Sequence, residues 1–189
     1  MDLLGDDPPR DLAAFRSWWL EAPGLDAIGP RGRVPPRGTL GAALMVLVTD
    51  PEEGDRERLL DGPQGRLLAA FLAAAGLAES EVYLASSLPR HTPMADTVRL
   101  AAGGMDAVTL HHIALAAPQR VLALGTGLAP LIGHSTAQDI SGLDNINHKG
   151  RSIPLMVSEG LESLIAMPRL KARLWRRWIE WSQDFTVQR

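Results

Sequence analysis

The chain contains no cysteine and no long apolar run, and each absence excludes a class of protein. Without cysteine, its 189 residues can form no disulfide, no thiolate-bound zinc site, no iron–sulfur cluster and no cysteine nucleophile. Because no run of about 18 apolar residues occurs, we expect no membrane-spanning segment. The acidic N-terminus lacks the basic and apolar regions of a signal peptide. We therefore expect a cytoplasmic protein without membrane contact.

The composition is that of an ordinary globular protein, but its charge is unevenly spread. Hydrophobic residues make up 46% and charged residues 22% of the chain, and the length suits one domain. The net charge is −3, yet residues 149–189 hold eight basic and four acidic residues. A basic C-terminal region is compatible with phosphate binding, and equally with a solvated helix face.

Apolar segments and helical patterns alternate along most of the chain. Residues 11–22 have helical spacing and precede a linker rich in proline and glycine, so residues 1–39 are expected to form an N-terminal helix and linker. Residues 40–189 are expected to form the main domain. In it, strands are predicted at 43–48, 82–88, 120–125 and 153–158, and helices at 62–77, 94–118 with a break at Gly103-Gly104, 127–134 and 168–181. This alternation predicts a three-layer α/β/α sandwich that binds ligands beyond the carboxyl ends of its strands.

Acidic residues follow the first predicted strand. Asp50 ends the strand, and Glu52, Glu53 and Asp55 come next. Such a cluster can orient a water molecule or bind a hard cation such as magnesium, and Asp50-Pro51 can also simply open a turn. Asp50 is the main catalytic candidate, and no metal and no cofactor are expected.

Two histidines are secondary candidates because they fall on predicted loops. His91 follows the second strand, and His148 lies in the segment LDNINHKG. Each is also compatible with an ordinary surface histidine. Gly125 and Gly127 follow the third strand, but Pro130 occupies the third position of a dinucleotide-binding fingerprint, so we interpret the glycines as a tight turn.

Five segments occur in an order and at spacings that resemble the uracil-DNA glycosylase superfamily, especially its bacterial iron–sulfur branch. They are ALMVLVTDPEEGD, LLDGPQGRLLAAFLAAAGL, EVYLASSLPRHTP, RVLALGTGLAPLIG and IPLMVSEGLESLIAMPRLKARLWRRW, and the resemblance covers about residues 40–181. The resemblance implies a four-stranded parallel sheet between helices. It also implies a pocket that receives a flipped-out base and hydrolysis of the N-glycosidic bond.

The sequence departs from this family at most positions that carry chemistry. Asp50 fits the water-positioning residue. The stacking phenylalanine falls on Leu60, and the asparagine that reads the uracil edge falls on Ser86. The histidine that supports the departing uracil anion falls on Gly160, and a small phosphate-gripping residue falls on Glu162. These base-pocket positions predict weak or absent uracil excision.

The last predicted helix keeps the proline, lysine and tryptophan spacing of the family at Pro168, Lys171 and Trp175, and it is strongly basic. We expect DNA to bind this helix. The helix that carries Trp18-Trp19 is expected to dock either on its own domain or on a protein partner. Three hypotheses stay open: a DNA-binding protein with degenerate excision, an active glycosylase for uracil or another base in which His91 or His148 serves the leaving group, and a non-catalytic α/β binding module. The phosphate-binding candidates are Arg169, Lys171, Arg173 and Arg176.

Overall fold

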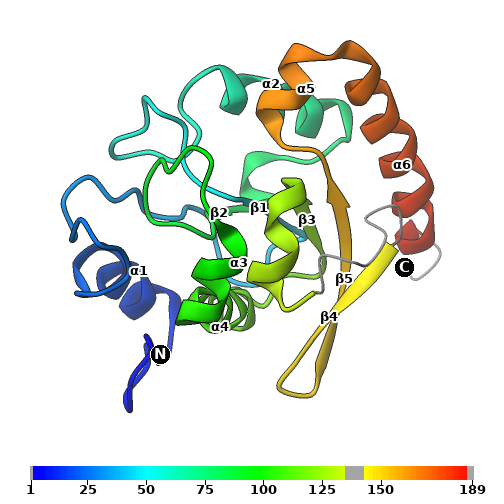
Figure 1. The fold of residues 1–189 in the computed structure, drawn as a ribbon. Helices are drawn as coiled ribbons and strands as arrows, with labels where there is room; N and C mark the ends of the chain where they lie inside the picture. The colour runs from blue at the N-terminus through cyan, green and yellow to red at the C-terminus, as the bar shows by residue number, and fades with distance from the viewer. Residues whose placement is uncertain (1, 135–142, 187–189) are drawn as a thin grey trace.

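The computed structural model describes residues 2–134 and 143–186, and a five-stranded sheet runs through its centre. The strand order is β2-β1-β3-β5-β4 (Figure 1). The first four strands in this order are parallel, and β4 is antiparallel to β5. The strands are β1 (Leu44–Val48), β2 (Val82–Ser86), β3 (Val121–Leu124), β4 (Leu143–His148) and β5 (Arg151–Ser158).

Helices cover both faces of the sheet, so the sheet is the middle layer and the helices form the two outer layers (Figure 1). All residues of β1, β2 and β3 are buried, because side chains of alternating residues enter two separate hydrophobic cores. The first core contains residues of α1 (Leu12–Glu21), α4 (Asp106–Ala116) and the 3₁₀ helix η3 (Thr126–Ile132). The second contains residues of α2 (Pro63–Ala74), α5 (Leu161–Ala166) and α6 (Pro168–Thr186).

The predicted α/β class is confirmed, together with most of the elements. The expected break at Gly103-Gly104 is present: a π-helical turn η2 (Ala101–Met105) separates α3 (Thr97–Leu100) from α4, and Gly104 has a φ of 107°. A short 3₁₀ helix, η1 (Glu79–Glu81), precedes β2. Within the described residues, no helix is long and apolar enough to cross a lipid bilayer.

Two elements differ from the prediction. The sheet has a fifth strand, β4, where the polar segment LDNINH was expected to be a loop. An edge strand needs few buried side chains, and Ile146 alone has a buried side chain among residues 144–148, so periodicity does not reveal it. The segment after β5 was also expected to be a loop, but it contains α5.

The N-terminal helix α1 docks on the main body of the chain. Asp11 caps it by accepting a hydrogen bond from the Ala14 backbone N–H at 2.8 Å. Trp19 is 1% exposed, and its Nε1 donates to the Val34 carbonyl at 3.0 Å. The Trp18-Trp19 helix therefore uses its buried tryptophan to contact its own sheet layer, and this packing offers no support for a protein partner at that residue.

The linker after α1 covers the outer edge of β2. Arg37 and Leu84 exchange two backbone hydrogen bonds of 2.9 and 2.8 Å. The chain then passes so close to the sheet that a Cβ on Gly38 would lie 2.7 Å from the Tyr83 Cα. An uncovered edge strand is a template for aggregation, so this linker protects the sheet.

His112 packs against α1 in the core, and its burial predicts that the stability of this packing depends on pH. Its ring stacks on Phe15 with 4.0 Å between centroids, and its Nε2 lies 2.8 Å from the Tyr83 hydroxyl. Burial, and secondarily the neighbouring His111, lowers the pKa of His112 to about 3. The unfolded chain takes up this proton near pH ~6.5, so the free energy of unfolding should fall as the pH decreases from there towards 3.

Urea unfolding between pH 7 and 5, where most carboxylates stay ionised, checks this expectation. We expect a loss approaching ~1.4 kcal/mol per pH unit below the unfolded pKa. The His112→Gln variant keeps a hydrogen-bonding group near Tyr83. In this variant, the free energy of unfolding should fall less steeply with decreasing pH, by that amount. An identical slope in both proteins would show that His112 is not the group responsible.

Candidate active site

A cavity of about 410 Å³ lies at the carboxyl ends of β1, β3 and β5. Parallel strands place their carboxyl ends at one edge of the sheet, which is the upper edge in Figure 1. This is the edge at which α/β proteins bind ligands. The lining includes Asp50, Gln64, His91, Gly160 and Glu162, together with the hydroxyl residues Thr49, Thr92, Thr97, Thr126 and Ser163.

Asp50 stands at the end of β1 and is held by the loop that follows β2. Its Oδ2 accepts a hydrogen bond from the Thr92 backbone N–H at 2.7 Å and lies 3.1 Å from Nδ1 of His91. The same His91 nitrogen lies 3.0 Å from the Pro51 carbonyl. Because both neighbours of this nitrogen are acceptors, we assign the proton to Nδ1. The structure thus brings together two of the three residues predicted as catalytic.

Burial sets the proton affinity of Asp50. Its side chain is 22% exposed, and removal from water raises the pKa of this carboxyl above its usual range. The Thr92 N–H and His91 partly offset this rise, whereas the charge of Glu162 adds to it. A carboxylate with a raised pKa, facing a cavity, is a suitable general base for activating water.

The raised pKa has a consequence for stability. The folded chain holds the Asp50 proton more tightly than the unfolded chain, so this contribution is present below the unfolded pKa and is lost as the pH rises through the folded pKa. At pH 7 the ionised carboxylate should therefore destabilise the fold relative to a neutral group of the same shape.

We expect Asp50→Asn to have a higher melting temperature than the wild type at pH 7, with a smaller difference at pH 4. Thermal unfolding at both values measures this. Asp61→Asn, at an exposed carboxylate on a nearby loop, is the matched control and should change little. A lower melting temperature for Asp50→Asn at pH 7 would mean that Thr92 and His91 outweigh the cost of burial.

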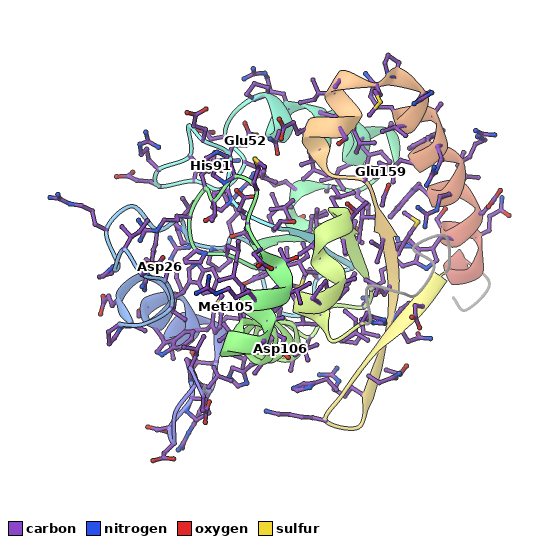
Figure 2. The ribbon with its side chains drawn as sticks, in the orientation of Figure 1. Asp26, Glu52, His91, Met105, Asp106 and Glu159 are labelled. Carbon is purple, nitrogen blue, oxygen red and sulfur yellow. The ribbon has the colours of Figure 1, made fainter. Side chains whose placement is uncertain are left out.

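The N-terminal linker holds the loop that carries His91. Arg90 forms an ion pair with Asp26 at 2.9 Å and donates to the carbonyls of Arg31 and Gly29. The Arg90 carbonyl in turn accepts a hydrogen bond from the Thr92 hydroxyl at 2.9 Å. Asp26 and His91 both appear in Figure 2, on the linker and on the loop. Sequence reasoning missed this support because Asp26 and Arg90 are 64 residues apart and neither lies in a recognisable motif.

Of the roles that the sequence left open for the acidic cluster after β1, Glu52 and Asp55 fill the structural one, because they hold the turn that follows the strand. Asp55 is 4% exposed and accepts three backbone N–H groups, those of Glu52, Leu60 and Asp61, at 2.7–2.9 Å. Glu52 is 7% exposed and accepts the Gly65 N–H at 2.7 Å, in the first turn of α2. Their oxygens are therefore occupied, and no group of three potential metal ligands exists among the residues described.

Leu60, Ser86 and His148 do not line this cavity. Leu60 is 4% exposed and packs in the core beneath α2. The Ser86 hydroxyl is buried and donates to the Leu88 carbonyl at 2.7 Å. His148 pairs with Arg151 where the β4–β5 hairpin turns. This places it at the amino end of β5, at the end of the sheet opposite the cavity (Figure 1). Of the positions Leu60, Ser86, Gly160 and Glu162, to which the resemblance assigns chemistry, Gly160 and Glu162 line the cavity.

The basic residues of α6 lie outside the cavity. Arg169, Lys171, Arg173 and Arg176 are all exposed. Arg173 forms an ion pair with Glu159 at 2.9 Å, just beyond β5, where Figure 2 labels Glu159. Lys171 borders a separate apolar cavity of about 190 Å³ between α2, α5 and α6. These cations therefore form an outer surface next to the site.

Comparisons with protein families and with curated proteins gave no match: no model of a protein family matches the chain, and no curated protein matches its sequence.

Proposed function

We propose that the chain has a uracil-DNA-glycosylase-like fold and hydrolyses an N-glycosidic bond, with Asp50 activating the attacking water. The observation that carries the proposal is the Asp50–His91 pair, with 3.1 Å between Oδ2 and Nδ1, on the wall of the cavity at the end of β1. The four parallel strands between two helical layers agree with the family resemblance. Asp50 also falls on the water-positioning residue of that resemblance.

In this mechanism, ionised Asp50 takes a proton from water while the water oxygen attacks C1′ of the sugar. The C1′–N bond breaks, and its electron pair leaves with the base. His91 and the Thr92 N–H fix the carboxylate through Oδ2, which leaves Oδ1 for the water. His91 is thus a positioning residue for the base catalyst, because its Nδ1 faces Asp50.

The fold supports DNA as one source of the substrate, through the exposed basic face of α6. Phosphate contacts position a nucleic acid without reading its sequence, and arginine and lysine are the usual donors. The same surface supports a second candidate function, that of a protein that binds DNA without excising a base. The two are separated by base release, which only the first requires.

The test is a panel of single- and double-stranded oligonucleotides and free nucleosides that carry uracil, hypoxanthine, xanthine or an alkylated purine. The released base is measured by chromatography, and DNA affinity is measured in parallel as salt is raised. Release of any base, lost in Asp50→Asn, supports the proposal. Salt-sensitive binding without release favours a DNA-binding protein. If the protein neither releases a base nor binds DNA, the result favours the non-catalytic α/β module.

A further inference from the structure

The two walls of the cavity differ in chemistry. Asp50 and His91 lie beyond β1 and β2, whereas Gly160 and Glu162 lie beyond β5, and β3 separates β1 from β5. With adjacent strands ~4.8 Å apart, the β1 and β5 ends are on the order of 10 Å from one another. An attacking water and a departing base occupy opposite sides of C1′. A water bound by Asp50 therefore places the base towards the β5 wall.

The β5 wall is unsuited to a base that departs as an anion. Gly160 has no side chain to donate a hydrogen bond, and Glu162 presents a carboxylate that also interacts electrostatically with Asp50. Among the four lining residues beyond β5, Gly160, Leu161, Glu162 and Ser163, the side-chain donor is the neutral hydroxyl of Ser163, which lies next to Glu162 in the sequence. No lysine or arginine occurs in the described lining of the cavity. Uracil leaves as an anion, and stabilising such charge normally requires a donor or a cation close by.

A base that is already positively charged reverses this requirement. It departs as a neutral molecule, so no donor has to support it, and the carboxylates of Asp50 and Glu162 attract it in the bound state. The oxocarbenium-like sugar that forms as the bond breaks is also a cation, and the same two carboxylates face it. The negative charge of the cavity then favours both the binding of the substrate and the breaking of its bond.

We propose that the substrate of this cavity is an N-glycoside of a cationic base, such as an N7-alkylated purine, in a nucleoside or in DNA. The inference rests on the proposed N-glycosidic hydrolysis and names its substrate class. Water adds its oxygen to C1′, the C1′–N bond breaks, and its electron pair neutralises the cationic base. The water proton passes to Asp50 and then to solvent, so atoms and charge balance.

The first test compares 7-methylguanosine with guanosine and uridine, and repeats the comparison with the same bases in an oligonucleotide. We expect the protein to release neutral 7-methylguanine. The rate should exceed both the rate without enzyme and the rate of the Asp50→Asn variant. Activity on the free nucleoside would identify a nucleoside hydrolase, and activity only on the oligonucleotide would identify a DNA repair enzyme. Release of uracil or another neutral base in preference to 7-methylguanine overturns this inference and leaves the proposed function standing. Release of no base overturns both.

Variants of the β5 wall provide the sharper test. Glu162→Gln should lower kcat/KM for 7-methylguanosine by about tenfold, and Glu57→Gln, at an exposed glutamate outside the cavity, should leave it unchanged. Gly160 has a φ of −67°, and a Cβ there would lie 3.8 Å from the Gly125 Cα, so the site accepts a side chain. Gly160→His with Glu162→Gln should shift the preference from cationic bases towards uracil. An unchanged preference in both variants contradicts a role for this wall.

Discussion

Replacing Asp50 with asparagine is expected to reduce base release by a factor of about 10²–10⁴, which is the usual contribution of a general base. The amide keeps the shape of the side chain and can still accept the Thr92 N–H, but it cannot take a proton from water. The effect should fall on kcat more than on KM, because the proton transfer occurs only in the transition state. Initial rates of base release measure both parameters.

The pH profile distinguishes this role from a structural one. Burial raises the pKa of Asp50, so activity should be lost on the acidic side at a pH above the usual range of a carboxylate. His91 opposes this rise, and His91→Gln should therefore move the acidic limb to still higher pH. Two results would remove Asp50 from the mechanism. One is a loss of activity in the usual pH range of a carboxylate, and the other is equal rates for Asp50→Asn and wild type.

Replacing Asp55 with alanine is expected to lower the free energy of unfolding by about 3–5 kcal/mol. The carboxylate accepts three backbone N–H groups in a buried loop, and each would lose a charge-assisted hydrogen bond that is worth ~1.5–3 kcal/mol. Partial hydration of the loop offsets some of this loss. The same hydrogen bonds hold Leu60 at its positive φ of 57°, a strained conformation for a branched side chain.

Urea unfolding measures this change, with Asp61→Ala on the exposed side of the same loop as the control. Asp61 makes a solvent-exposed contact of 3.8 Å with Arg58, and such pairs contribute little. Its replacement should cost less than ~1 kcal/mol. Similar losses for the two variants would show that the buried hydrogen bonds of Asp55 are not what stabilises the loop.

The structure also explains which site residues could be found from the sequence. Asp50 is visible because it ends a continuous apolar strand, and the carboxyl end of a parallel strand is a general site position. His91 is visible only as a histidine on a loop. Its contact with Asp50 depends on β1 and β2 being neighbours, which follows from the sheet order. His148 looked equivalent from the sequence, but the unexpected β4–β5 hairpin carries it to the other edge of the sheet.

Periodicity and composition by themselves determined the α/β class, the four parallel strands, the break at Gly103-Gly104 and the position of Asp50. These depend on local patterns, because strands that are buried on both faces are continuous apolar runs, and adjacent glycines favour a break in a helix. Tertiary structure alone decided the fifth strand, the use of Glu52 and Asp55 by backbone N–H groups, and the Asp26–Arg90 support of the His91 loop. Each of these is a polar interaction between segments whose own sequences give no sign of the partner, since a hydrogen bond depends on the spatial position of both groups.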